Sequence, residues 1–324
     1  MLYIYNSNKN INIMLTPAQI TEIFCFVDDF CIQFDHFFEN HPFSDECFNF
    51  KKVDYSKFCL HPSEVITLQI CFHHSAFRSF KSFYFQVAIP YLSNLFPNLP
   101  SYNRFVELQS MAFFHNYFFT KFSCVGQCDG VSYIDSFKLA VCHNKRIYQN
   151  KVFKNWAQRG CTSTGYFYGF KGHILINSKC EIIDFQLTSG NVADNNEQVL
   201  QELCKNVFGK IYGDKGYIMN SEKMEFLFKK GIQFVTKLRK NMKNKLMDLM
   251  DKILLKKRGI VETVIDQLKN ICQIEHTRHR SPINFYNNFL SAIAAYYFKA
   301  DKPKLRINKK TQSNYNPLQL TLDL

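Results

Sequence analysis

The spacing of apolar residues changes at Val131, and this change constrains the fold more than any other feature of the chain. Before it, apolar residues recur at helical intervals behind residues that commonly begin helices, so residues 15–120 are predicted to be all-helical. The predicted helix starts are Thr16 with Gln19 as a capping box, Pro62-Ser63-Glu64, and Ser101, with a further helix over 80–95 that Pro90 interrupts or kinks.

After Val131, strand-like segments come first and then alternate with helices. The predicted strands are 133–142, 166–176, 181–187, 210–212 and 233–238, and the predicted helices are 195–207, 221–230, 245–254, 258–272 and 283–298. The second and third strands read as a hairpin. This order indicates an α/β domain with a mixed sheet flanked by helices. The chain therefore divides into a disordered lead (1–13), a helical N-terminal domain (14–125), an α/β domain (126–298) and a polar tail (299–324).

The positive charge of the chain is concentrated in its second part. The net charge is +13, but residues 1–130 hold 8 Lys/Arg against 11 Asp/Glu, so residues 131–324 hold the whole excess. A block this basic predicts a polyanionic partner, most commonly nucleic acid. A basic surface without a function is the alternative.

Two further features bound the class of protein. No apolar run approaches the roughly 18 residues of a membrane span, and the N-terminus lacks a basic segment followed by an apolar one. The twelve cysteines include no CxxC pair, which favours buried, reduced thiols over a zinc site. We expect a soluble, cytoplasmic protein.

Three acidic residues stand out by their position. Asp135 lies in the first strand of the α/β domain, and Asp214 follows a short strand in the stretch Gly-Asp-Lys-Gly-Tyr. Glu262 lies on a helix, where Arg258 and Lys269 share its face because they are four and seven residues away. Active residues of α/β sheets gather at strand ends. Taken singly, each acid could also be a bulge, a turn or a solvated surface residue.

Together these side chains suit the cleavage of phosphodiester bonds. Hard cations such as Mg²⁺ prefer carboxylate oxygens, and two such ions about 4 Å apart activate the attacking hydroxyl and stabilise the leaving oxygen. Two aspartates on neighbouring strands and a glutamate from a packed helix can hold that pair. Arg258 and Lys269 are predicted to hold DNA phosphates, the arginine through paired hydrogen bonds and the lysine as a point charge.

The spacing of Arg258, Glu262 and Lys269 resembles the Arg-Glu-Lys part of the signature of insertion-sequence-4-like DDE transposases, with Leu255 where that signature has Tyr. From about Leu15 to Phe298 the chain is still more similar to the insertion-sequence-982 family. The matching stretches are 62–68 (Pro-Ser-Glu-Val-Ile-Thr-Leu), 101–108 (Ser-Tyr-Asn-Arg-Phe-Val-Glu-Leu), 133–136 (Tyr-Ile-Asp-Ser), 142–147 (Cys-His-Asn-Lys-Arg-Ile), 213–217 (Gly-Asp-Lys-Gly-Tyr) and 240–245 (Lys-Asn-Met-Lys-Asn-Lys).

This resemblance implies a bacterial insertion-sequence transposase whose ribonuclease-H-like catalytic domain occupies residues 126–298. Asp135, Asp214 and Glu262 would hold two Mg²⁺ or Mn²⁺ ions for cleavage at the element's ends and strand transfer into target DNA. The implied partners are double-stranded DNA, at terminal inverted repeats and at the target, and further copies in a homodimer or higher assembly. The N-terminal domain would read DNA ends or dimerise. A catalytically inactive DNA-binding relic and a metal-dependent nuclease without strand transfer are the alternatives.

The remaining candidates are contacts around this centre. Lys215 is predicted to contact the DNA backbone, as are His143, Lys145 and Arg146, which are expected beside Asp135. His173 is expected in the core or behind the site rather than as a metal ligand, since hard cations take oxygen. Trp156 is expected to pack, with stacking on a flipped base as the alternative.

Overall fold

The structure is a computed structural model that describes residues 3–6, 9–12, 15–40, 55, 58–162, 165–237, 247–275 and 279–305. The sequence motif at 240–245 and the tail beyond Leu305 lie outside these residues. Among the described helices, none is long and apolar enough to cross a membrane.

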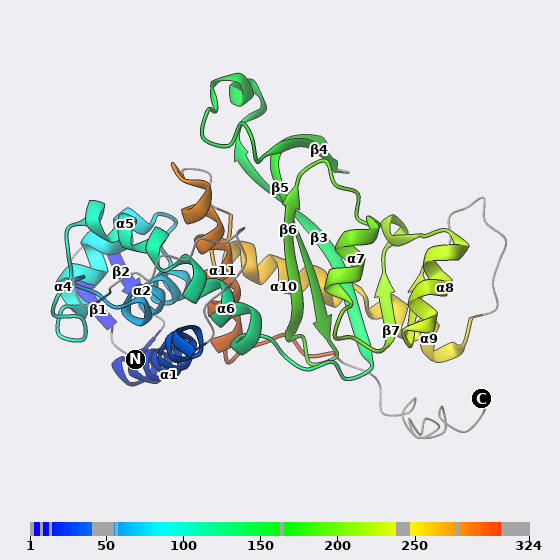
Figure 1. Cartoon of the computed structure of the whole chain (residues 1–324), viewed down its shortest axis with the longest axis horizontal. Coiled ribbons are helices and arrows are strands. Elements are labelled where there is room, and N and C mark those ends of the chain that lie inside the picture. Colours follow the sequence, from blue (N-terminus) through cyan, green and yellow to red (C-terminus); the bar gives the residue numbers. More distant parts are fainter. Residues whose placement is uncertain are drawn as a thin grey trace.

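Within residues 15–40 and 58–120, which the structure describes, the predicted helical region is confirmed (Figure 1). Its main helices are α1 (Pro17–Asn40), α2 (Pro62–His74), α5 (Tyr102–Met111) and α6 (Phe113–Ser123). The capping box before α1 is present, because Gln19 Oε1 accepts from the Thr16 backbone N–H at 2.8 Å and Thr16 Oγ1 accepts from Gln19 N–H at 3.3 Å. The helix predicted from Ser101 to about Phe118 is divided at Ala112.

The interruption expected at Pro90 is a π-helical turn. Helix α3 (Phe80–Phe83) passes into the π-turn η2 (Tyr84–Ala88) and then into α4 (Ile89–Leu92). The backbone N–H of Ile89 bonds to the carbonyl of Tyr84, five residues back. Since Pro90 has no N–H to donate and its ring crowds the preceding turn, a wider turn keeps the helix continuous in direction.

A mixed sheet forms the centre of the second part of the chain. Its strands are β3 (Val131–Cys142), β4 (Gln158–Thr162), β5 (Gly165–Asn177), β6 (Ile182–Ser189), β7 (Gly209–Gly213) and β8 (Ile232–Thr236). Across the sheet the order is β6-β5-β3-β7-β8, and β4 pairs with the first residues of β5 on the edge that β6 also uses. The β5–β6 hairpin is confirmed; β5 is antiparallel to β3 and β6, whereas β3, β7 and β8 are parallel.

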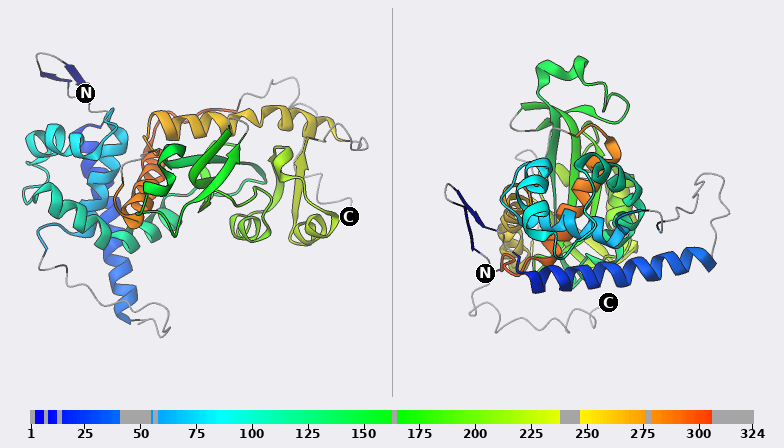
Figure 2. Two further views of the ribbon diagram at one scale, coloured as in Figure 1. Left: turned by 90° about the horizontal axis from the view of Figure 1, so that it is seen from above. Right: turned by 90° about the vertical axis from the view of Figure 1, so that its left-hand side faces the viewer.

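Helices cover both faces of the sheet (Figure 2). Alternate residues of β3 point to opposite faces: Ile134 packs in the cluster with α7 (Glu197–Leu203) and α8 (Ser221–Lys229), whereas Tyr133 and Phe137 pack in the cluster with α9 (Leu249–Lys257) and α10 (Gly259–Asn270). The predicted α/β architecture of a mixed sheet flanked by helices is therefore present.

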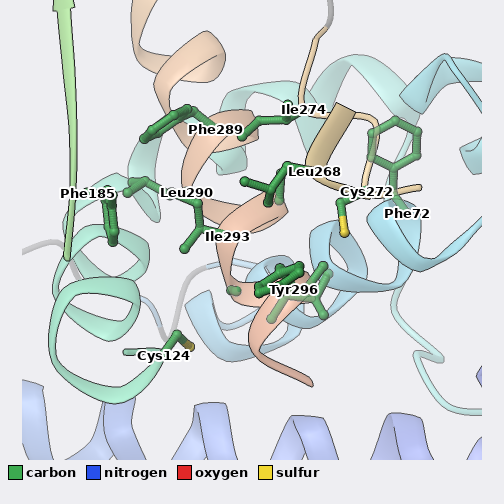
Figure 3. Packing of buried hydrophobic residues seen from close by; sticks show 14 of the residues in the cluster. Phe72, Cys124, Phe185, Leu268, Cys272, Ile274, Phe289, Leu290, Ile293 and Tyr296 are labelled. Atoms are coloured by element: carbon green, nitrogen blue, oxygen red, sulfur yellow. The ribbon is translucent and has the colours of Figure 1, made fainter. Parts of the chain in front are cut away.

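Helix α11 (Pro282–Phe298) lies between the sheet and the N-terminal helices (Figure 3). On the sheet side, Phe285 stacks on Phe170 with ring centroids 4.9 Å apart, and Phe289 meets Phe185 at 5.8 Å. On the other side α11 packs against α2, α5 and α6. The expected boundary at residue 125 marks the change from helices to strands, but one hydrophobic core continues across it.

The N-terminal lead differs from the expectation. Residues 1–13 were predicted to lack regular structure, yet β1 (Tyr3–Asn6) and β2 (Lys9–Asn12) pair as an antiparallel hairpin. The run Tyr3-Ile4-Tyr5 consists of β-formers that favour extended backbone, a signal that the Asn-rich composition obscured. The hairpin is a separate two-stranded sheet and stands away from the helices in Figure 2.

Candidate active site

The register of two parallel strands brings Asp135 and Asp214 to the same level of the sheet. Strands β3 and β7 pair with Tyr133 opposite Tyr212, and each aspartate comes two residues after its tyrosine. Residues two positions apart on a strand point to the same face. Strand β7 ends at Gly213, so Asp214 stands at its carboxyl end and begins the short 3₁₀ turn η4 (Lys215–Tyr217). The two aspartates predicted from sequence therefore lie on adjacent strands.

Arg258 joins these aspartates to Glu262. It stands at the junction of α9 and α10, with a side chain that is only 12% exposed. One terminal guanidinium nitrogen donates to Asp135 Oδ2 at 3.3 Å, and the other donates to Glu262 Oε1 at 2.9 Å and lies 3.9 Å from Asp214 Oδ1. The three predicted carboxylates thus converge on one cation. The sequence placed Arg258 one helical turn from Glu262 but assigned it to DNA rather than to this central position.

The three carboxylates differ in their exposure. The Asp135 side chain is 20% exposed, against 51% for Asp214 and 61% for Glu262. Burial raises the pKa of Asp135 to about 6, opposed by the Ser136 backbone N–H and by Arg258, and reinforced by the charges of Glu262 and Asp214. Three carboxyl groups facing a single guanidinium leave an excess of negative charge, which is an environment that attracts further cations.

A second polar cluster lies behind Asp135, on the opposite face of β3. Ser136 Oγ donates to Asp194 Oδ1 at 2.7 Å, and the buried Lys171 ammonium donates to the same oxygen at 3.0 Å. Asp194 also lies against the loop that carries Asp214, since a Cβ on Gly216 would come within 3.3 Å of Asp194 Oδ2. This cluster therefore connects strand β3 to the loop that carries Asp214. Sequence reasoning missed both Asp194 and Lys171, although a lysine inside the apolar strand 166–176 signals a buried partner.

His173 belongs to this supporting layer, as predicted. It is fully buried, and its Nε2 is 2.9 Å from Thr188 Oγ1. Burial lowers its pKa to about 4, so the imidazole is neutral at ordinary pH. Asp266, one turn beyond Glu262, is exposed and accepts a hydrogen bond from the Asn270 amide at 2.6 Å.

The structure separates several predicted DNA contacts from the carboxylates. Lys215 is exposed beside Asp214, as expected. Lys269 shares α10 with Glu262, but it lies 3.4 Å from Glu275 and over the ring of Phe137. The expectation that His143, Lys145 and Arg146 lie beside Asp135 is wrong. They follow Cys142, and at about 3.3 Å per residue the seven residues of strand from Asp135 span about 23 Å.

The donor set of the cluster suits a hard divalent cation, because it consists of carboxylate oxygens with excess negative charge. In the described part of the chain, however, no group of three or more His, Cys, Asp or Glu residues is already arranged as a metal site. The carboxylates instead face the guanidinium of Arg258. Leu255, where the transposase signature has Tyr, is buried in the core and does not line the cluster.

Fold and site together define an α/β domain with a carboxylate cluster on two central parallel strands and a helix, an arrangement compatible with a ribonuclease-H-like domain. Residues 125–282 match the family model of the transposase DDE domain. No curated protein matches the chain. The matched range begins just before β3 and ends at the first residue of α11, so it encloses all three carboxylates. The part of the chain that holds the three carboxylates is therefore similar to the transposase DDE domain, and this similarity implies an enzyme that acts on DNA.

Proposed function

We propose that this protein is an insertion-sequence transposase that cleaves DNA strands at the ends of its element and joins them to target DNA. The convergence of Asp135, Asp214 and Glu262 on one cation is the observation that carries the proposal. These residues are as far as 127 residues apart in the sequence. Three unrelated surface acids would have no reason to lie together at one point of the structure. The similarity to the insertion-sequence-982 family supports the same reading.

We infer that Arg258 holds the carboxylates in place until divalent ions bind. Its guanidinium neutralises part of the negative charge at the position where cations are needed. Mg²⁺ or Mn²⁺ ions bound by the three carboxylates would supply Lewis-acid activation of the attacking hydroxyl and stabilisation of the leaving oxygen. Asp135 is suited to the inner position, since the Ser136 backbone N–H holds one carboxylate oxygen at 2.8 Å. The more exposed Asp214 and Glu262 face the solvent from which DNA approaches.

Double-stranded DNA is the proposed substrate. The excess positive charge of residues 131–324 supports phosphate binding around this domain, and Lys215 stands exposed next to Asp214. Lys269 is assigned a weaker role, because Glu275 already partly neutralises it. The proposed assembly on DNA is a homodimer or larger, since two element ends are processed together in strand transfer.

The test is a strand-transfer assay with the purified full-length protein, a labelled duplex that ends in the element's terminal repeat, and a supercoiled target plasmid. With Mg²⁺ or Mn²⁺ we expect nicked substrate and, in addition, labelled products longer than the substrate; EDTA should abolish both. Nicking without longer products would identify a nuclease that does not join strands. DNA binding without either reaction in both metals would identify an inactive relic.

A further inference from the structure

The segment between β3 and β4 is a basic projection far from the carboxylates. We call residues 143–157 the arm; it extends beyond the sheet at the top of Figure 1. The chain has no Asp or Glu between Asp135 and Glu181, whereas the arm carries Lys145, Arg146, Lys151 and Lys154. All four cations are exposed, and none has an ion pair within the described parts of the chain. The charge of the arm is therefore not neutralised by its own neighbours.

The arm has a defined conformation. Phe153 is buried, and its ring contacts Phe170 of β5 and Phe285 of α11, with centroids 5.9 and 5.4 Å apart. The backbone is held as well, because Asn150 Oδ1 accepts from the Phe153 N–H and Tyr168 Oη donates to the Phe153 carbonyl. Phe153 thus anchors the arm to the core together with Ala157 and the partly buried Ile147, and the charged side chains of the arm remain exposed.

Two aromatic rings of the arm are held in solvent. Trp156 is 62% exposed and Tyr148 is 93% exposed, so the expectation that Trp156 packs in the core is wrong. Phe153, three residues earlier, occupies the available core position instead. Exposed rings among unpaired cations are the combination that binds nucleic acid, with cations on phosphates and rings against bases.

The arm lies at a distance that a DNA duplex spans. About 23 Å of strand separate Asp135 from Cys142, where the arm begins. At about 3.4 Å per base pair, this distance corresponds to roughly seven base pairs. A duplex whose phosphate lies at the carboxylates can therefore reach the arm, and contacts there would fix its direction.

We propose that the arm is a second DNA-binding element, which holds the substrate about seven base pairs from the phosphate that is cut. Lys145, Arg146, Lys151 and Lys154 contact the backbone, and the ring of Trp156 lies against a base. The proposal rests on the proposed function for the identity of the substrate as DNA. A second copy of this chain could bind the arm only if it offered an acidic surface to the same four cations. DNA is the better fit, because every phosphate of its backbone offers the required charge.

The test uses Trp156 as a direct reporter, because it is the only tryptophan of the chain. Its emission is titrated with a 40-base-pair duplex in EDTA at several NaCl concentrations, using the full-length protein. We expect the emission to change with the same Kd that a gel shift gives. The Lys151→Gln/Lys154→Gln variant should lower the slope of log K against log salt by about 1.8, since each lost phosphate contact removes about 0.9.

A matched control removes the same charge elsewhere. Lys179 and Lys205 are exposed at the opposite end of the sheet, so Lys179→Gln/Lys205→Gln should leave the slope close to that of the unmodified chain. Trp156→Ala should weaken binding roughly tenfold in the gel shift, and Trp156→Phe should restore most of that loss.

Three results would overturn the proposal. One is unchanged Trp156 emission when the gel shift shows that the duplex is bound, and another is an equal salt slope in the arm and control variants. A Trp156 signal that depends on protein concentration without DNA would overturn it in favour of an interface between copies. Failure of the proposed function would give a different result: DNA would still bind through the arm and change the Trp156 emission, but it would not be cut.

Discussion

Replacement of Arg258 by methionine should destabilise the protein more in the absence of divalent metal than in its presence. Methionine retains an unbranched chain like the aliphatic part of arginine, but it lacks the guanidinium on which the three carboxylates converge. Without metal, the carboxylates then repel one another with no charge between them. With metal, the bound ions take over that neutralisation.

The size of the effect follows from the two hydrogen bonds of Arg258. The bond to Asp135 is largely buried on both sides, and a charge-assisted bond of that kind contributes about 2 kcal/mol. The bond to Glu262 is exposed to solvent on the acid's side, so it contributes about 0.5 kcal/mol. The total of about 2.5 kcal/mol corresponds to a fall of about 5 °C in Tm, since 1 kcal/mol shifts Tm by about 2 °C in a chain of this size.

The assay is thermal unfolding of both proteins in EDTA and in 10 mM Mg²⁺, followed by circular dichroism. In EDTA we expect the Arg258→Met protein to melt about 5 °C lower, and in Mg²⁺ we expect this gap to narrow. Arg104→Met is the control, because Arg104 pairs with Glu107 at 2.6 Å on an exposed helix surface and should cost at most about 1 kcal/mol. Equal melting of Arg258→Met and the unmodified protein in EDTA would refute the reasoning.

Three further outcomes are expected. Burial lowers the pKa of His74 and of His173 to about 4, below the value of about 6.5 in the unfolded chain, so the folded state binds fewer protons between these values. The stability that these two neutral histidines contribute should therefore be fully present above pH 6.5 and be lost as the pH falls towards 4. In pH-dependent melting, a His74→Gln/His173→Gln double variant should show a smaller decrease of Tm over this range. An isolated 15–125 fragment should lack cooperative unfolding by circular dichroism, because α11 completes its core; a sharp transition would contradict this. Deletion of residues 1–13 should leave Tm and nicking activity unchanged, because the β1–β2 hairpin pairs only with itself in a separate sheet, and a loss of either would show that it supports the fold.

The local elements were predictable because their signals are local. The caps at Thr16 and Ser101 depend on residues within three positions, and the β5–β6 hairpin depends on two adjacent apolar runs. Strand β4 was not predicted, since Gln158–Thr162 is polar and contains a glycine. Its extended form comes from pairing with β5 rather than from its own residue preferences.

The sequence of α11 indicated its position between two layers, but the predicted domain division did not take this into account. The helix is buried on every face, because Phe285, Leu290 and Ile293 pack on one side and Asn287 and Ser291 are fully buried on the other. Such a helix is covered on every face, so it had to lie between two layers and not on the outside of the sheet. Assigning it to the α/β domain alone overlooked this requirement.

The three carboxylates were predictable as a set, whereas their geometry was not. Their positions on two strands and a helix follow from the sequence motifs, but the contact between Arg258 and Asp135 crosses 123 residues and depends on how α10 packs on β3. The misplacement of His143–Arg146 has a simpler cause. The strand was predicted correctly to residue 142, but its length was not converted into a distance from Asp135.

The most direct test of the proposed function is Mg²⁺-dependent nicking at the terminal repeat by a Glu262→Gln variant, with DNA binding followed by gel shift. The substitution keeps the volume and helix preference of the side chain but removes a charged ligand from the cluster. We expect nicking to fall by orders of magnitude while binding persists, and the same for Asp135→Asn and Asp214→Asn. Asp266→Asn is the control, because Asp266 bonds only to Asn270 on its own helix and should be nearly fully active. Near-normal nicking by Glu262→Gln, or a collapse confined to Asp266→Asn, would contradict the proposed assignment of the site.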